Sequence, residues 1–379
     1  MLPDDLSLFK SGGIKPPQLV KHLPPGFSVV QNQETLLQGK LRDTFDGCCR
    51  RAGVVLLQQK NRVSWIHLKS GRMEEQAVSG DWSFAGELKG GPVGFQCLEL
   101  SGLRAFSDLE ALEVRSAEWA VTDELEKTVV RFRSIHLRRG PKQASWIFLQ
   151  PLRGYDDDAL RVFQALEKYG FRRGGTDYFP LIGLDAPLYE AKPPMDLRAA
   201  SPAIETAGRI IENCIVTARR NEPGILDDID TEFLHDYRVC LRRARSVLSL
   251  FRGVYAAGFC DAAKQQLADV MKQTNRLRDL DVYLLDRHAY YDMVPESQFG
   301  GLDIMFGIFE AERGEALEGV RAAITQPDYE RGLDNLLANF QTLEKKNHGP
   351  AAQDPTGVFA KRLILKRYGK IASIAAVID

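Results

Sequence analysis

The sequence predicts an α+β protein made of an N-terminal antiparallel β-tunnel or barrel followed by an all-α helical bundle. The chain has 379 residues, and domains usually contain about 100–200 residues, so two domains are expected. All four tryptophans and the short β-branched segments precede residue 180, whereas helical periodicity dominates from residue 201. We therefore expect domains at 1–180 and 201–379, joined by a proline-containing linker at 181–200.

The N-terminal part contains short segments rich in β-branched and aromatic residues, which favour strands. Strands are expected at 53–59, 63–68 and 144–149, with a first candidate strand in 26–40. Residues 156–170 have apolar positions three and four apart, begin with aspartates and end at a glycine, as a capped helix does.

The C-terminal part has helical spacing interrupted by turn residues. The expected helices span 202–221, 231–253, 258–287, 301–325, 328–345 and 356–377. Breaks are expected where turn residues gather between them, at 221–224, 253–258, 294–301 and 349–355.

Composition limits the function classes. The formal net charge is −1, so any anion binding must come from the arrangement of charge. No apolar run reaches about 18 residues, and the acidic N-terminus has no secretory pattern, so a cytoplasmic protein is expected. The six cysteines form no CxxC pair and the six histidines are scattered, so neither disulfides, nor a metal site, nor a cofactor is expected.

Residues 230–251 form the most informative segment. At 100° per residue, Arg238, Arg242, Arg245, Ser249 and Arg252 share one stripe, and His235 lies at its edge. Arg238 and Arg242 are like charges at i, i+4, which costs an exposed helix roughly 0.2–0.5 kcal/mol, so an anion nearby is indicated. That anion could be a carboxylate of the chain itself or an external phosphate, which the planar guanidinium of arginine suits.

Two further segments bear on this stripe. The C-terminal segment 356–378 has five cations and no acid, and Arg362, Lys366 and Lys370 share one face, while acids gather in 310–318. Segregated charge of this kind creates a focused field. In 275–284, Asp279 and Asp281 are expected to hold arginines within the bundle. They are not expected to bind a metal together, because carboxylates at i, i+2 diverge on a helix.

The motifs LHDYRVCLRRARSVLSLF and LRDLDVYLLD, with FEAERGEALEGV after them, closely resemble those of CHAD domains over about residues 201–379. The resemblance implies paired four-helix bundles with basic residues lining a groove that binds polyphosphate without catalysis. The chain would hold the first half of such a module and the start of the second. The residues expected to contact the polyanion are His235, Arg238, Arg242, Arg243, Arg245, Lys272, Arg276, Arg278, Lys361, Arg362, Lys366 and Lys370.

The segment KLRDTFDGCCRRAGVVLLQQK and the later SWIFLQPLRGYDDDALRVFQALEKYG resemble parts of CYTH domains, which are β-tunnels that bind triphosphate with a metal. The expected ExExK motif is absent, since the first strand candidate has only Glu34 and ends in Lys40. A degenerate CYTH-like domain that has lost its metal chemistry is therefore expected.

Three functions remain open at this point. The first is a non-catalytic binder of inorganic polyphosphate, in a bacterial cytoplasm where it could associate with polyphosphate granules. The second is a CYTH-class metal-dependent triphosphatase or polyphosphatase, which needs more tunnel carboxylates than this sequence offers. The third is a nucleic-acid-binding module, which lacks aromatic residues between the arginines for base stacking. His235 could sense pH near its reference pKa of about 6.5, or bond a neighbouring aspartate. No membrane partner is expected.

Overall fold

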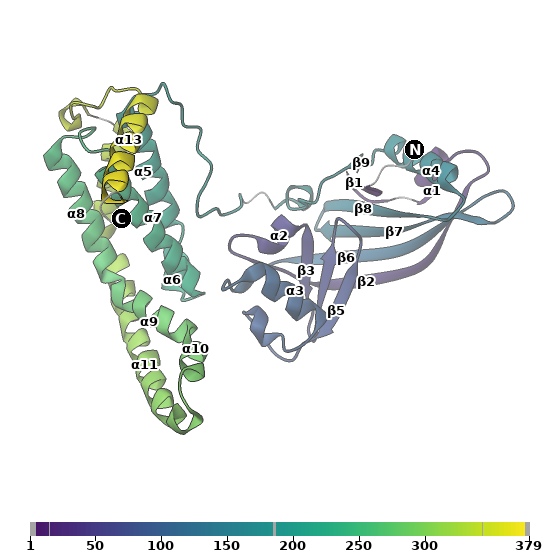
Figure 1. The fold of residues 1–379 in the computed structure, drawn as a ribbon. Coiled ribbons are helices and arrows are strands. Elements are labelled where there is room, and N and C mark those ends of the chain that lie inside the picture. Colours follow the sequence, from purple (N-terminus) through teal and green to yellow (C-terminus); the bar gives the residue numbers. More distant parts are fainter. Residues whose placement is uncertain (1–4, 15, 185–186, 343, 376–379) are drawn as a thin grey trace. The chain divides into compact units, whose positions relative to one another are not determined.

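The computed structural model describes residues 5–14, 16–184, 187–342 and 344–375. The chain divides into two compact units, Met1–Tyr189 and Glu190–Asp379, and each is described by itself (Figure 1). The division falls between the last helical turn of the first unit, Pro180–Ile182, and the first helix of the second, α5 (Ala203–Arg219).

The first unit contains a nine-stranded antiparallel sheet in the order β5-β4-β3-β2-β6-β7-β8-β1-β9. Its strands are β1 (Ser7–Ser11), β2 (Ser28–Thr44), β3 (Val54–Gln58), β4 (Arg62–His67), β5 (Met73–Ala77), β6 (Phe106–Thr122), β7 (Thr128–Arg139), β8 (Lys142–Pro151) and β9 (Arg172–Arg173). The strands expected at 53–59, 63–68 and 144–149 are confirmed as β3, β4 and β8. The candidate first strand is β2 instead, because the short β1 precedes it and pairs with β8.

Helices cover the sheet in two places. Helices α1 (Pro16–His22) and α4 (Asp156–Lys168) belong to a core with β6, β7 and β8, while α2 (Cys48–Ala52) and α3 (Pro92–Ser101) belong to a core with β3 and β4. The helix expected at 156–170 is confirmed as α4, with three aspartates in its first turn. The side chains of Tyr178, Phe179 and Ile182 complete a third core against β2, β3, β6, β7 and β8.

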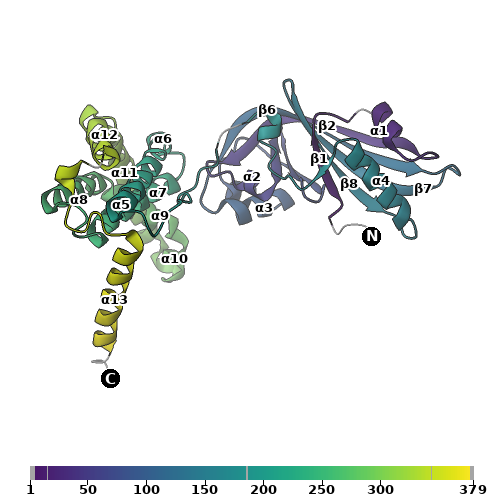
Figure 2. The ribbon, with the colours of Figure 1, turned by 90° about the horizontal axis from the view of Figure 1, so that it is seen from above.

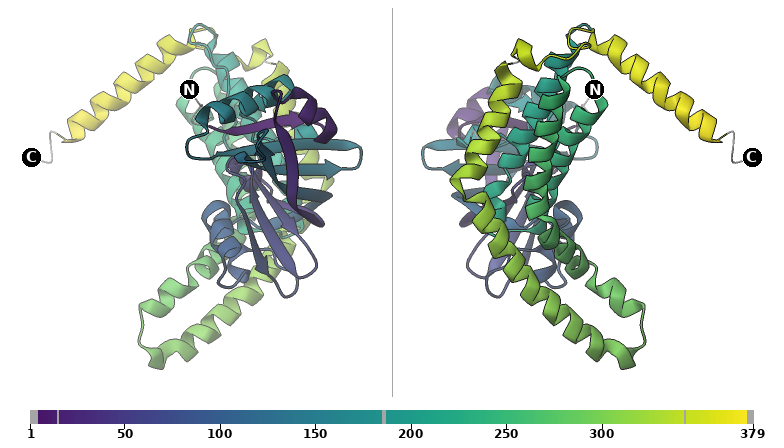
Figure 3. Two further views of the ribbon diagram at one scale, coloured as in Figure 1. Left: turned by 90° about the vertical axis from the view of Figure 1, so that its right-hand side faces the viewer. Right: turned by 90° about the vertical axis from the view of Figure 1, so that its left-hand side faces the viewer.

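The second unit is helical. After α5 come α6 (Glu222–Leu226), α7 (Thr231–Leu250), α8 (Ala257–Gln273), α9 (Asn275–Leu285), α10 (Arg287–Asp292), α11 (Phe299–Ile324), α12 (Pro327–Thr342) and α13 (Thr356–Ala375). Helices α5, α7, α8, α11 and α12 contribute to one core. Figure 3 shows α9, α10 and α11 extending from one end of this bundle, while α13 leaves it at the other end.

Two expectations about this unit are wrong. The helix expected at 258–287 is α8 and α9, separated by Thr274, whose hydroxyl donates to the Met271 carbonyl at 2.8 Å and so satisfies the end of α8. The break expected at 221–224 contains the short α6. Only one residue separates α8 from α9, so the helical periodicity of the sequence continues through the break. Among the described residues, no helix is long and apolar enough to cross a membrane.

Candidate functional site

Helix α7 and the turn after it present a cationic ridge, defined here as Arg238, Arg242 and Arg245 of the helix and Arg252 of the turn. Asp230 begins the helix, because its carboxylate accepts the backbone N–H groups of Glu232 and Phe233 at 2.9 and 3.3 Å. The apolar face of α7 packs into the bundle core with Tyr237, Leu241, Ala244 and Leu248 fully buried. Burial of that face fixes the helix rotation, so the arginine stripe lies at the edge of the core.

Arg238 lies at the junction between α8 and α9. Its guanidinium Nη1 donates to the Met271 carbonyl at 3.1 Å, to Thr274 Oγ1 at 2.6 Å and to Asn275 Oδ1 at 2.9 Å. These acceptors are neutral, so the charge of Arg238 is solvated by dipoles and keeps its full value. Burial lowers the pKa of Arg238, and the neighbouring cations Arg242 and Arg278 lower it further.

Other cations gather at the same junction. Arg278 of α9 has a buried Nη1 with no hydrogen-bond partner among the described residues, and such orphaned donors are rare in folded proteins. Arg245 Nη1 lies 3.9 Å from the Met271 sulfur, and Lys272 is exposed next to that residue. Arg238, Arg242, Arg245, Lys272 and Arg278 are called here the junction cluster. The cluster lies where α7 meets the end of α8, and Arg278 Nη1 is the donor in it that has no acceptor among the described residues.

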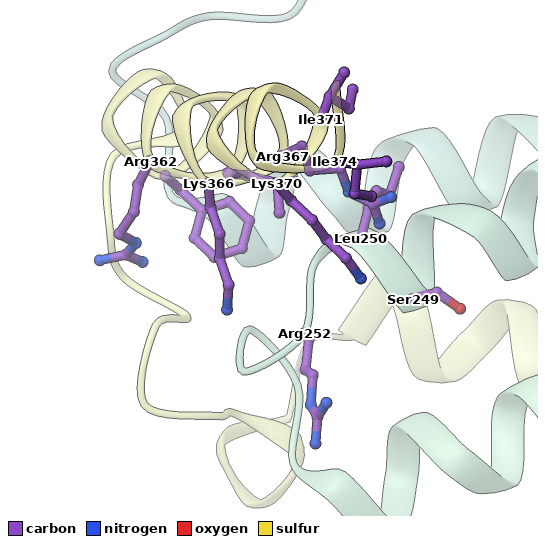
Figure 4. A pocket seen from close by; sticks show the side chains of 11 residues that line it. Ser249, Leu250, Arg252, Arg362, Lys366, Arg367, Lys370, Ile371 and Ile374 are labelled. Atoms are coloured by element: carbon purple, nitrogen blue, oxygen red, sulfur yellow. The ribbon is translucent and has the colours of Figure 1, made fainter. Parts of the chain in front are cut away.

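The ridge continues into a cavity of about 820 Å³ between the end of α7 and α13, called here the α7–α13 cavity (Figure 4). Phe251 and Phe359 stack with ring centroids 5.2 Å apart and anchor the start of α13 there. Lys366 and Lys370 point from α13 to the side where Arg252 lies. The charged residues that line the cavity are Arg252, Arg362, Lys366, Arg367 and Lys370. The cavity wall is therefore strongly positive.

Most arginines of the second unit that lie outside the ridge and the cavity form ion pairs with carboxylates. Arg276 pairs with Glu312, Arg287 with Glu310 and Arg219 with Asp334. Among the residues that the structure describes, no carboxylate lies within 4.0 Å of the side-chain nitrogens of the ridge, of Lys272, or of Lys366, Arg367 and Lys370. Arg362 is the exception in the cavity, with Asp354 at 2.8 Å. Without carboxylates beside them, the ridge and the cavity can receive an external anion.

The predicted site residues therefore separate into groups. Seven lie in the junction cluster or the cavity: Arg238, Arg242, Arg245, Lys272, Arg278, Lys366 and Lys370. Arg362 also lines the cavity, but as an ion pair. Arg276 is neutralised by Glu312, and Arg243 lies near the Cys214 and Cys240 thiols, away from the ridge. Lys361 does not line the cavity, and His235 is half-buried one turn before Arg238.

Two cavity residues were missing from the predicted set, Arg252 and Arg367. Arg252 could have been found, since it falls on the arginine stripe of the sequence. Arg367 carries no such signal, because it is offset from the Arg362, Lys366 and Lys370 stripe and reaches the cavity only through the placement of α13.

Asp281 has a structural role. Its carboxylate is buried and accepts from Arg313 Nε at 2.7 Å, while the two terminal nitrogens of Arg313 bind Asp228 at 2.7 and 2.9 Å. One arginine thus joins α9, α11 and the start of α7, as expected for an acid that holds an arginine within the bundle. The Arg313 guanidinium lowers the pKa of Asp228, whereas burial raises that of Asp281.

In the first unit, carboxylates on the sheet are engaged by arginines. Arg138 binds Glu113 through two nitrogens at 3.0 and 2.6 Å, and Arg115 binds Glu34 at 3.0 Å. The bond from Arg138 lowers the pKa of Glu113 to about 2. Metal ions bind carboxylate oxygens, but Glu34 and Glu113 are already paired with arginines, which offset their negative charge.

Three buried residues of the first unit, Asp43, Cys48 and Cys49, are of the types that bind metals and were not among the predicted site residues. The donor atoms of Asp43, Cys48 and Cys49 lie within 4.8 Å of one another. The Asp43 carboxylate, however, accepts the backbone N–H groups of Thr44, Cys49 and Arg50 at 2.8 to 2.9 Å, which caps α2. The pKa of the Cys49 thiol is raised well above its ordinary value by its bond with Cys48 and by burial. This group is therefore explained as local structure.

Comparison with known proteins gives one result for this chain. A scan against protein-family models matches residues 209–377 to the CHAD domain. The match covers α7, the α8–α9 junction and α13, and so contains the ridge and the cavity. A search of curated proteins finds no match.

Proposed function

We propose that the chain, whose residues 209–377 match the CHAD domain, binds inorganic polyphosphate along the α7 ridge and in the α7–α13 cavity, without converting it. The proposal rests on a row of cations that have no ion pair within 4.0 Å among the described residues, in a unit whose other arginines are mostly paired. Asp279 and Asp261 influence Arg238 and Arg252 only at longer range. An external polyanion supplies the missing countercharge.

The residue types fit a phosphate polymer. Arginine donates parallel hydrogen bonds to two phosphate oxygens, and it keeps its charge when it is partly desolvated. Arg238 and Arg245 are seven residues apart on α7, so this part of the ridge is about 10 Å long at 1.5 Å per residue, and Arg252 follows after the helix ends. A ligand that repeats its charge along its length can contact both ends of such a ridge, whereas a single phosphate cannot.

The other two functions are less well supported. A CYTH-class triphosphatase would use a metal held by carboxylates of the first unit, and Glu34 and Glu113 are bound by arginines there. We propose that the first unit is a degenerate CYTH-like domain for this reason. Nucleic-acid binding would draw on aromatic side chains beside the arginines. The aromatic residues near the cavity, Phe251 and Phe359, are stacked on each other.

Competition between ligands tests the proposal. A labelled polyphosphate bound to the full chain is displaced with unlabelled polyphosphate or with single-stranded RNA of matched total charge. We expect polyphosphate to compete at a concentration at least tenfold lower. Equal competition would show a general polyanion site, and preferential displacement by RNA would contradict the proposal.

A further inference from the structure

The guanidinium of Arg238 has two edges, and the chain itself occupies one of them. Nη1 donates to the Met271 carbonyl at 3.1 Å, to Thr274 Oγ1 at 2.6 Å and to Asn275 Oδ1 at 2.9 Å. Nε and Nη2 bond no acceptor among the residues that the structure describes. A guanidinium binds the two oxygens of a carboxylate or a phosphate through two parallel N–H groups. The edge formed by Nε and Nη2 is therefore open to such a ligand.

The acceptors for Nη1 come from the break between α8 and α9. Helix α7 packs against both of these helices, which brings Arg238 to the break (Figure 2). The last carbonyls of a helix have no partner within it, and they carry the negative end of the helix dipole, which attracts a cation. The Met271 carbonyl is one of these at the end of α8. A single uninterrupted helix would give this carbonyl to the N–H of Asn275 instead.

Thr274 and Asn275 set the direction of the remaining bonds. Thr274 is 1% exposed, and its hydroxyl donates to the Met271 carbonyl at 2.8 Å, so its lone pairs are left to accept from Arg238. The exposed Asn275 closes the other side through its amide oxygen. All three acceptors are neutral, and Asp279 acts on Arg238 only at longer range. The side chain is thus held without a carboxylate that would compete for its open edge.

We propose that the break between α8 and α9 holds Arg238 in place, with Thr274 and Asn275 as positioning residues, so that its Nε–Nη2 edge binds two oxygens of a single phosphate group. This inference rests on the proposed function, since the phosphate belongs to the polymer that the ridge is proposed to bind. Each internal phosphate of inorganic polyphosphate has two non-bridging oxygens, which match the edge. A side chain that is already held loses little conformational freedom on binding, so its contact is stronger than that of a mobile arginine.

Polyphosphate titration of the full chain tests the two positioning residues. Thr274→Val and Asn275→Ala should each weaken binding about two- to tenfold, because Arg238 must then be immobilised when the ligand binds. Neither change removes a charge, so the slope of log affinity against log salt should stay that of the parent chain. Arg238→Ala, by contrast, should make that slope shallower by about one unit.

Two comparisons separate positioning from a general loss of structure. Thr274→Ser keeps the hydroxyl and should keep the affinity of the parent chain. Thr325 Oγ1 donates to the Arg321 carbonyl at 2.8 Å at the end of α11 and accepts from no arginine in the described part of the chain, so Thr325→Val should leave binding unchanged. Parent affinity in both Thr274→Val and Asn275→Ala would overturn the positioning role and leave the proposed function intact.

Arginine-selective nitrogen NMR of the full chain observes the contact itself. The Nε signal of Arg238 is identified by its loss in Arg238→Lys, and pyrophosphate is the probe, because it presents phosphate oxygens on a small ion. We expect pyrophosphate to shift this signal in the parent chain and to shift it less, at equal concentration, in Thr274→Val. A shift without binding of the polymer would contradict the proposed function and support the contact. A signal that pyrophosphate leaves unchanged would overturn the contact.

Discussion

Arg238 and Arg242 lie one turn apart on α7, but their surroundings differ. Arg238 is half-buried and bonded to three acceptors at the α8–α9 junction, whereas Arg242 is exposed. Binding and folding can therefore be separated at these two positions. Arg243, on the same helix but away from the ridge, provides a control of equal charge.

Arg242→Ala should weaken polyphosphate binding roughly tenfold, the loss expected for one charged contact, and change the free energy of unfolding by less than about 0.5 kcal/mol. Isothermal titration and urea unfolding measure the two quantities. Arg243→Ala should keep the affinity of the parent chain within about twofold. Equal losses in both variants would show that net charge, and not the ridge, determines binding.

Arg238→Ala should weaken binding and also lower the free energy of unfolding by about 1.5–3 kcal/mol, because charged hydrogen bonds at the α8–α9 junction are lost. The double variant Arg238→Ala with Arg242→Ala should abolish binding while the unit stays folded. Circular dichroism and the binding titration check this pair. A folded double variant with the affinity of the parent chain would remove the ridge from the proposed site.

At the scale of elements, Arg313 holds α9, α11 and the start of α7 together. Arg313→Ala should lower the free energy of unfolding by roughly 3–5 kcal/mol, because the buried Asp281 carboxylate loses its countercharge. Replacing both, Arg313→Met with Asp281→Leu, should recover most of that loss. Urea unfolding of the three proteins gives the comparison, and a double variant as unstable as the single one would contradict it.

The pH dependence of the Arg313→Ala defect follows from the two acids. Asp228 has a lowered pKa in the folded parent chain, so its contribution is present above its unfolded pKa of about 3.9 and is lost as pH falls. Asp281 has a raised pKa, so without Arg313 its penalty is relieved as pH falls. The stability difference between parent and variant should therefore shrink as pH falls from 7 toward 4, through Asp281, and shrink further below pH 4, where the contribution of Asp228 is lost. A difference that grows on acidification would contradict this assignment.

Helix α13 contributes the second wall of the cavity. Lys366→Glu with Lys370→Glu should reduce polyphosphate affinity by at least tenfold, since both side chains line the cavity and reversal adds repulsion. Lys361→Ala should have little effect, because Lys361 does not line the cavity. Binding assays under one salt condition distinguish the two. Similar losses from both changes would mean that α13 acts only through its total charge.

The parts of the fold that were predicted are those with a local cause. The arginine stripe of α7 and the aspartate-rich start of α4 each follow from positions within one helix. The break at Thr274 could not be predicted, since a single threonine interrupts the helix without changing its period. The orphaned donor of Arg278, the reach of Arg367 and the pairing of Glu113 with Arg138 depend on tertiary contacts or strand register.

For the whole molecule, the first unit should contribute no hydrolysis of triphosphate. Glu34 and Glu113 are bound by arginines, so neither offers a free carboxylate for a metal. Phosphate release from the full chain with Mn²⁺ should match the rate without protein, and Glu34→Gln should change nothing. Metal-dependent release that falls in Glu34→Gln would restore the triphosphatase function.

The cations of α7 and α13 should bind a polyanion through many charged contacts, which a titration of the full chain with long-chain polyphosphate at several salt concentrations measures. We expect tight binding at low salt that weakens steeply as salt rises, because bound counterions are released. The slope of log affinity against log salt should become shallower by about one unit in Arg242→Ala. Absence of binding, or binding indifferent to salt and to Arg242, would show that these cations do not form a polyanion site.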